Sequence, residues 1–153
     1  MQIAPIAISL KELAASDPMA AALGTAGLAG GLHYGVRATY TAVRPFATFS
    51  VVETDREENS SGTDLVTYDV TVTVVVEQLG EIAAAILNVF RTYWGRLMDL
   101  PGLDAAEAEF VLIHPEGTEI GEAEQEDLGN DVIIGVTSFT LKLAEHSPAI
   151  VED

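Results

Sequence analysis

The side chains that could carry out chemistry in this chain are three histidines and a large set of carboxylates. His33, His114 and His146 lie far apart, and none belongs to an HExxH or a similar metal-binding spacing. Each histidine is therefore expected to be solvated or to act as a cap, not to bind a metal or to transfer protons. The chain contains no cysteine, which excludes disulfides, thiolate metal sites and cysteine nucleophiles. The sequence thus predicts a protein with no cofactor and no metal.

The carboxylates are densest in residues 116–131, which we expect to form an acidic loop. They lack the order of an EF-hand loop, in which glycine is sixth and a glutamate closes the site. A solvated acidic loop is the favoured interpretation, and weak binding of divalent cations is the alternative. No GxSxG, P-loop or GxGxxG motif occurs, and nothing places two carboxylates in an apolar cleft. The sequence therefore predicts that the chain is not an enzyme.

The overall charge restricts the partners of the chain. The chain contains seven lysines and arginines and 24 aspartates and glutamates, so its formal net charge is −17 over 153 residues. Such a surface repels phosphate groups, and we expect no tight binding to nucleic acid and none to anionic membranes. The same repulsion would let DNA slide past the surface without sticking. Residues 1–10 lack the positive region of an export signal, and the apolar residues 18–32 are too short to span a bilayer. We therefore expect a soluble protein made in the cytoplasm.

The elements that must position these side chains begin with a helical segment at residues 8–23. Ser9 and Glu12 have the spacing of a capping box, which predicts a helix start. Pro18 follows an aspartate and indicates a second start, so the segment is expected to contain two short helices. Residues 24–35 are rich in glycine and are predicted to form a loop.

Two strand patterns follow the loop. Residues 45–53 and 65–77 are predicted to pair as an antiparallel hairpin, with the charged segment 54–64 as its connector. From Tyr68 to Val76 every second residue is apolar, which is typical of a strand with one buried face. The opposite face carries three threonines (Thr67, Thr71 and Thr73) and Val75, which suit neither a dry core nor a fully charged exterior.

A helix and two further strands complete the pattern. Residues 80–98 show helical spacing, and 106–115 and 131–144 are predicted to be strands. The apolar phase of the last strand changes part-way along. This change indicates either a bulge near Ser138 or burial on both faces.

The fold class predicted from these elements is α+β, with helices packed on one face of an antiparallel sheet of about four strands. Residues 1–144 would form one domain, built from the helical segment 8–23, the loop 24–35 and a core over 36–144 in ββαββ order. Residues 145–153 are expected to be a flexible tail.

Three parts of this arrangement are candidates for contact with other subunits. The helix at 80–98 has a second apolar stripe offset from its main one, and a helix with two such stripes is either deeply buried or shared between two surfaces. The threonine-rich face of strand 65–77 and the charged hairpin connector are the other two. The candidate subunit or partner interface therefore comprises Asp55, Arg56, Glu57, Glu58, Thr71, Thr73, Val75, Leu87, Trp94 and Met98.

Three stretches of sequence carry a resemblance to a known family. They are "RPFATFSVVET", "DLVTYDVTVTVVVE" and "VIIGVTSFTLKL", with a helix before the first and an amphipathic helix after the second. A proline–aromatic pair at 45–46 opens the first strand, and the pattern Tyr68-x-Val70-x-Val72 marks the next. Over most of residues 8–144 the chain resembles the phage tail terminator (tail completion) family of small virion proteins.

The resemblance implies a structural protein of the virion with no catalytic residues. It implies a homo-oligomeric ring, commonly a hexamer, that caps the finished tail tube and meets the head–tail connector, with DNA able to pass through it. The expected partners are thus further copies of the chain, the tail tube protein and the connector protein. The alternative is another phage-like assembly component, such as a head–tail adaptor or a tube subunit. A small acidic ligand-binding module or an enzyme is a more distant alternative.

Overall fold

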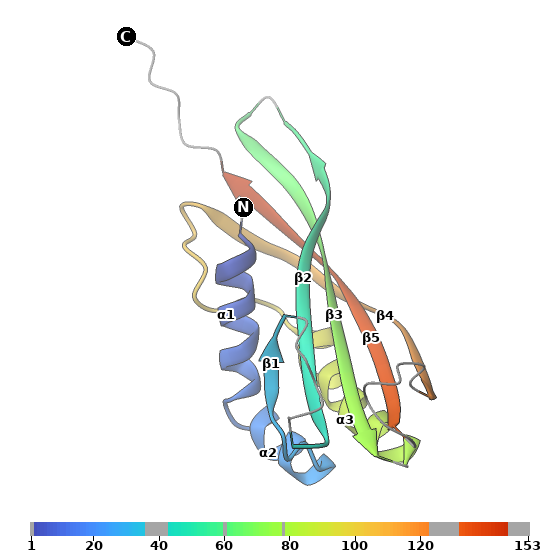
Figure 1. Cartoon of the computed structure of the whole chain (residues 1–153). Helices are drawn as coiled ribbons and strands as arrows, with labels where there is room; N and C mark the ends of the chain where they lie inside the picture. The colour runs from blue at the N-terminus through green and yellow to red at the C-terminus, as the bar shows by residue number, and fades with distance from the viewer. Residues whose placement is uncertain (1, 36–42, 60, 78, 123–131, 147–153) are drawn as a thin grey trace.

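The computed structural model describes residues 2–35, 43–59, 61–77, 79–122 and 132–146. Within them the chain forms a twisted five-stranded sheet, with α1 and α3 packed on the same face (Figure 1). The elements follow in the order α1 (Ile3–Ala14), α2 (Met19–Ala26), β1 (Leu32–Tyr34), β2 (Phe46–Glu57), β3 (Thr63–Glu77), α3 (Gly80–Tyr93), the 3-10 turn Trp94–Arg96, β4 (Ala108–Glu122) and β5 (Val132–His146).

The strand order of the sheet is β1-β2-β3-β5-β4, so that β3 and β5 lie side by side near its centre. β1 is parallel to β2, and all other pairs are antiparallel. The predicted sheet of about four antiparallel strands is therefore corrected to a mixed sheet of five. The additional strand β1 comes from residues 24–35, which were predicted to be a loop. Because β1 has only three residues, it is too short to show a period-two pattern.

The alternation in β3 produces the core as predicted. The residues that face the helices are fully buried, and the residues between them from Thr67 to Thr73 are half-buried on the opposite face. The buried set is Val66, Tyr68, Val70, Val72, Val74 and Val76. α1 covers this face over β1 and β2, and α3 covers it over β3, β4 and β5. One apolar layer thus lies between the helices and the sheet.

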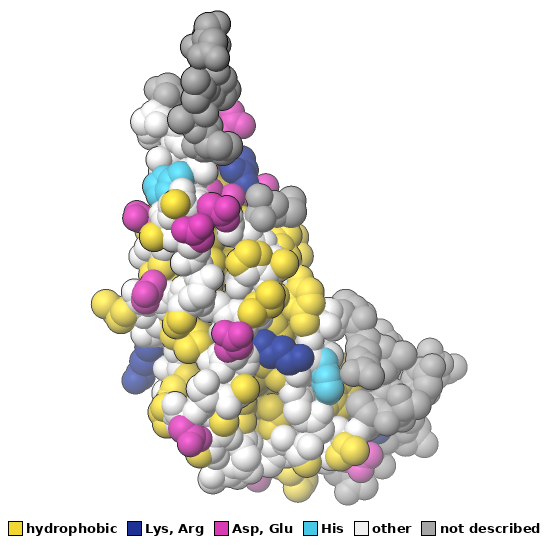
Figure 2. Space-filling view, turned by 90° about the vertical axis from the view of Figure 1, so that its left-hand side faces the viewer, with side chains coloured by type: hydrophobic (Ala, Val, Ile, Leu, Met, Phe, Trp, Pro, Cys, Tyr) yellow, Lys and Arg dark blue, Asp and Glu magenta, His cyan; other side chains and the backbone are white. Residues whose placement is uncertain are grey.

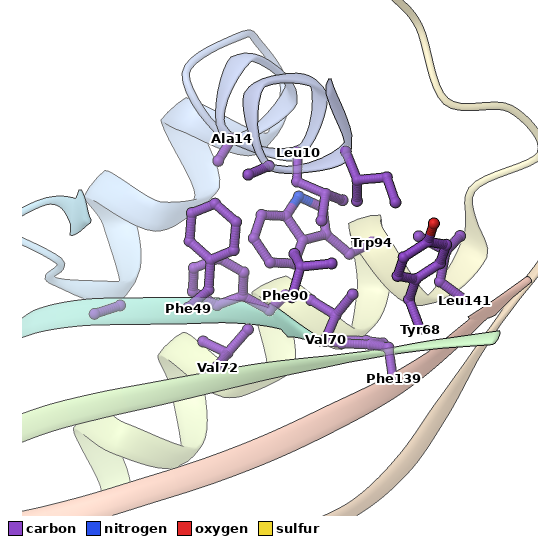
Figure 3. Packing of buried hydrophobic residues seen from close by; sticks show 14 of the residues in the cluster. Leu10, Ala14, Phe49, Tyr68, Val70, Val72, Phe90, Trp94, Phe139 and Leu141 are labelled. Carbon is purple, nitrogen blue, oxygen red and sulfur yellow. The ribbon is translucent and has the colours of Figure 1, made fainter. Parts of the chain in front are cut away.

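Trp94 lies at the centre of that layer. Its ring makes edge-to-face contacts with Phe49, Phe90 and Phe139, at centroid distances of 5.3, 4.8 and 6.2 Å. Such aromatic pairs add to the free energy gained by burial alone. Figure 3 shows the indole below Leu10 of α1, with the sheet on its other side. Trp94 therefore joins the N-terminal helix, α3 and two strands of the sheet, β2 and β5.

The predicted capping box at the first helix is wrong. α1 begins well before Ser9, so that Ser9 and Glu12 lie inside the helix. The buried hydroxyl of Ser9 instead donates a hydrogen bond to the carbonyl oxygen of Pro101, which ties α1 to the segment after α3. α2 continues into the predicted loop and ends at Gly27, whose φ of 98° lies in the left-handed region that favours glycine at a helix end.

The phase change in β5 results from burial on both faces. No register shift interrupts the β3–β5 ladder, so the possible bulge in β5 is excluded. One of two register shifts in the β4–β5 ladder lies opposite Ser138, and it is β4 that carries the extra residue. Val132 is buried with Phe46 and Val75 on the face away from the helices, whereas Phe139 is buried in the main core.

Several strands are longer than the sequence predicted. β2 and β3 extend into the charged segment 54–64, so residues 54–57 and 63–64 belong to strands and not to the connecting loop. β4 extends to Glu122 and takes in part of the predicted acidic loop 116–131, the rest of which lies outside the described residues. β5 reaches His146, and the remainder of the predicted tail also lies outside them.

Replacing Gly30 with alanine is expected to lower the free energy of unfolding by about 2 kcal/mol. A Cβ atom at Gly30 would collide with the carbonyl oxygen of Val43 and lie 2.9 Å from that of Pro45. Both contacts are with backbone, which cannot move aside as a side chain can. Urea denaturation measures the loss. Gly24→Ala is the matched control: a Cβ there meets no atom within 4 Å, and we expect it to stabilise α2 by about 0.5–1 kcal/mol. Equal stability of the two variants would contradict this prediction.

Candidate assembly surfaces

Of the three candidate residues on the second stripe of α3, only one is at the surface. Leu87 and Trp94 are 1% and 0% exposed, so their side chains are core and cannot touch another subunit in this conformation. Their proposed role in an interface is therefore wrong. Met98 lies beyond the 3-10 turn that ends the helical region and is 90% exposed. The second stripe is buried because it faces the sheet: Leu87 lies against Gly135 of β5, and Trp94 packs on Phe49 and Phe139.

Thr71 and Thr73 lie on the sheet face that α1 and α3 leave uncovered. They pair with Ser50 and Thr48 of β2, and Thr71 also pairs with Ser138 of β5. All five side chains are half-buried. Small hydroxyl side chains on neighbouring strands form a flat surface that carries little charge. Such a surface can be covered by another protein at a small desolvation cost, because hydroxyls are cheaper to bury than carboxylates.

Val75 occupies a different position on the same face. It is buried in a small apolar cluster with Phe46 and Val132, against which Ile134 also packs. Its side chain therefore contributes to the stability of the chain itself. Of the three predicted residues of this strand, Thr71 and Thr73 are the accessible ones.

The hairpin residues predicted to form a charged interface point in two directions. Asp55, Glu57 and Glu58 are exposed at the end of the β2–β3 hairpin. Arg56 is turned to the inner side of the sheet because a register shift between Glu53 and Asp55 reverses the alternation of β2. The hairpin thus presents carboxylates outward and keeps its one cation inside.

Arg56 is the centre of a network of three carboxylates. Its guanidinium nitrogens lie 2.7 Å from Glu53 Oε1, 2.9 Å from Asp64 Oδ2 and 3.3 Å from Glu145 Oε1. Hydrogen bonds to Glu53 and Asp64 raise the pKa of Arg56 above its ordinary value, so it stays protonated. Because these partners come from β2, β3 and β5, one cation holds three strands together at this end of the sheet.

Tyr68 extends the network to the N-terminus. Its hydroxyl donates a hydrogen bond to Glu145 Oε2 and accepts one from the backbone N–H of Gln2, at 3.3 Å. Burial raises the pKa of the Tyr68 phenol, and the hydrogen bond to Glu145 raises it further, because both disfavour the phenolate. The neutral phenol thereby links the start of α1 to the centre of the sheet.

This shift predicts a loss of stability in alkali that depends on Tyr68. The unfolded phenol ionises near pH 10 and the folded one at higher pH, so the contribution is complete below pH 10 and decreases above it. For one such group the free energy of unfolding falls by at most about 1.4 kcal/mol per pH unit. Urea titrations between pH 9 and 11 measure the slope. We expect a shallower slope for Tyr68→Phe than for the wild-type chain, and equal slopes would contradict the assignment.

The sequence did not indicate that the edge strand β4 exposes apolar side chains. Within the described part of the chain β4 pairs only with β5, so its other edge is open. Val111, Leu112 and Ile120 are 46%, 40% and 42% exposed. Two register shifts in β4 disturb the alternation that would otherwise place all apolar residues inward. An open edge with apolar side chains is a typical place for association with another chain.

A hollow between α1, α2 and β1 was also not predicted. Its volume is about 280 Å³, and its walls are mostly apolar. Ala14, Leu23, Leu28 and Leu32 contribute to the walls, and Lys11 is the one charged residue that lines it. Figure 2, which views the molecule from the left-hand side of Figure 1, shows apolar side chains spread over the surface and acidic ones only at intervals. No sequence motif marks the hollow, because it forms where three separate segments meet.

The three histidines lie apart in the fold. His33 Nε2 is 2.9 Å from the carbonyl oxygen of Gly30, and His146 Nδ1 is 3.0 Å from Thr63 Oγ1, while His114 is exposed on β4. Across the described residues, no group of three or more histidine, cysteine, aspartate or glutamate side chains is arranged to hold a metal ion. Among the helices that the structure describes, none has the length and apolar character needed to cross a membrane.

Comparison with known proteins gives a likeness of fold. No family model and no curated protein matches the chain. Among solved structures, a chain from "Virion of native gene transfer agent (GTA) particle" superposes with a TM-score of 0.59 at 16% sequence identity. The match covers 89% of this chain and 91% of that chain. The two chains therefore share a fold over nearly their whole lengths.

Proposed function

We propose that this chain is a structural component of a phage-like virion, specifically a tail terminator. In this role it forms a homo-oligomeric ring, with six copies as the expected number, that caps the tail tube and joins it to the head–tail connector. The observation that supports the proposal most is the shared fold with a chain of a gene transfer agent virion, which extends over nearly all of both chains. The Pro45-Phe46 and Tyr68-x-Val70-x-Val72 patterns support it independently, from the sequence.

The described surfaces suit a ring subunit. The threonine-rich sheet face at Thr71 and Thr73, the open edge of β4 and the exposed Met98 are three separate areas that a neighbouring protein can cover. A ring subunit needs at least two different contact areas, because each copy touches two neighbours. The net charge of −17 suits a ring through which DNA passes without binding. The proposed activity is assembly, with no catalytic step.

Measurements of the oligomeric state of the chain and of its binding to tail tubes test this proposal. Light scattering after size exclusion and negative-stain images should show a ring of defined size, either alone or on addition of tail tubes. A chain that stays monomeric at high concentration and does not bind tube ends would overturn the proposal. A fluorescent DNA duplex should show no tight binding at physiological salt.

A head–tail adaptor or a tube subunit is the second candidate. The same likeness supports it, because a fold shared with a chain of a virion does not specify which component of the particle this chain is. The three roles differ in where the chain lies along the particle. A terminator occupies one end of the tube, an adaptor binds the connector without the tube, and a tube subunit repeats along the whole length. Antibody labelling of a tagged chain in images of assembled particles separates these outcomes.

A further inference from the structure

The hollow between α1, α2 and β1 has a chemical character that limits what can fill it. Its walls are supplied mainly by alanine, leucine and glycine, and its volume of about 280 Å³ is near the lower end of the range of ligand pockets. It therefore has room for a short apolar segment rather than for a folded element. Lys11, at the hollow, is exposed and forms no ion pair with any described residue. A matching occupant is apolar with an adjoining negative charge.

The C-terminal sequence of the chain has this composition. After Ser147 and Pro148 come three apolar residues, Ala149 to Val151, and then two carboxylates, Glu152 and Asp153. Two aliphatic side chains followed by two acidic ones correspond to an apolar hollow with a lysine beside it.

The chain cannot place this tail in its own hollow. Leu32, at the hollow, is in register with Ala47, which is in register with Val74 and through it with Gly135 of β5. From Gly135 the strand β5 continues for eleven residues to His146, a distance of about 37 Å. Val151 is five residues beyond His146, and five residues span at most about 18 Å. The hollow and the tail thus belong to opposite ends of the sheet, as Figure 1 shows for α2 and the end of β5.

We propose that residues 149–153 of one copy bind in the α1–α2–β1 hollow of a second copy, with Ile150 and Val151 among the alanine and leucine side chains and Glu152 or Asp153 beside Lys11. This assignment deepens the proposed function, because it presumes that the chain assembles with itself, and it names the contact. The tail and the hollow are different surfaces, so each copy gives one and receives one. A contact of this kind closes into a ring if the rotation between copies allows it.

The assembly test uses full-length variants that remove one half of the contact. Ile150→Asp with Val151→Asp disables the tail and leaves the hollow intact. Gly24→Leu fills the hollow, since a Cβ at Gly24 meets no atom within 4 Å, and it exchanges glycine for a strong helix former in α2. Ala21→Leu is the matched control, because Ala21 is exposed on the same helix and does not line the hollow. Circular dichroism and thermal unfolding verify that each variant folds.

We expect the first two variants to need at least tenfold higher concentration than the wild type or Ala21→Leu to associate, as measured by light scattering. Mixing them is the decisive measurement. The tail-disabled chain still has a hollow, and the hollow-filled chain still has a tail, so the mixture should form a one-to-one dimer and nothing larger. Association of either variant at the wild-type concentration would overturn the proposal, and so would a mixture that stays monomeric.

A peptide measurement separates this inference from the proposed function. A fluorescein-labelled peptide of residues 147–153 should bind the full-length tail-disabled chain, as read by anisotropy. The added substitution Lys11→Glu should weaken binding about tenfold, and a peptide with lysine in place of Glu152 and Asp153 should recover it. If the wild-type chain forms rings but the peptide does not bind, the contact is wrong and the proposed function stands. If the peptide binds and the wild-type chain never associates, the contact stands and the ring is wrong.

Discussion

Replacing Trp94 with alanine is expected to lower the free energy of unfolding by about 3–5 kcal/mol. The indole is fully buried and makes edge-to-face contacts with Phe49, Phe90 and Phe139, which come from β2, α3 and β5. Its removal leaves a cavity that three separate elements would have to close together, and the surrounding structure relaxes only in part. Urea denaturation followed by circular dichroism measures the loss. A typical domain is stable by about 5–15 kcal/mol, so partial unfolding of this variant at 37 °C is a realistic outcome.

Two further variants distinguish core packing from an interface role. Met98→Ala removes an exposed side chain close in sequence and should change the stability by less than about 0.5 kcal/mol. Trp94→Phe keeps a ring and removes the indole Nε1–H, which is buried without an acceptor among the described residues. We expect it to be markedly milder than Trp94→Ala, because the lost volume is partly offset by removal of an unpaired donor. A Trp94→Ala chain with unchanged stability and altered oligomeric state would contradict the core assignment.

Replacing Arg56 with methionine is expected to lower the free energy of unfolding by about 2–3 kcal/mol. The substitution leaves Glu53, Asp64 and Glu145 close together with no cation among them. The side chain of Glu145 is only 8% exposed, so water compensates little for the lost partner. The value is below that of a fully buried pair because the side chain of Arg56 is 29% exposed and partly screened.

A double-mutant cycle tests whether the loss comes from the unpaired carboxylate. Adding Glu145→Gln to Arg56→Met removes the buried negative charge, and the double variant should be more stable than the sum of the single effects predicts. Arg96→Met is the control for removal of a surface cation, since Arg96 is exposed, and it should change the stability by less than about 0.5 kcal/mol. Additive effects in the cycle would show that Arg56 and Glu145 are not coupled and would contradict this prediction.

The parts of the fold predicted from sequence are those in which one continuous segment has one buried face. Apolar residues alternate along β3 because helices cover one side of it. In α3 they recur at helical spacing because one side of that helix lies on the sheet. Together with the strand patterns at 45–53, 106–115 and 131–144, these two patterns predicted an α+β fold with a hairpin, a helix and two more strands. They are properties of local geometry, and the sequence records them directly.

The features that were missed depend on contacts between distant segments. Ser9 reads as a helix cap, but its partner is Pro101, 92 positions away. Arg56 reads as an exposed hairpin charge, but a register shift turns it to the inner side, where Glu145 lies on another strand. The second stripe of α3 was open to two interpretations, because a helix covered on two sides and a helix shared between subunits have the same pattern. Only the packing of Leu87 and Trp94 against β2 and β5 decides between them.

The position of β5 has a consequence for biosynthesis. β5 is the last described strand in the chain, yet it lies between β3 and β4, and its ladder to β3 joins residues as far as 83 positions apart. While the ribosome is still adding the residues of β5, Phe139 and Leu141 are missing from the core, and the valine face of β3 and the aromatic rings around Trp94 have no complete cover. The nascent chain therefore holds an apolar surface open until β5 has been translated. Folding that waits for such distant pairings is slow and vulnerable to aggregation, so the cell's chaperones have their main opportunity to act in this interval.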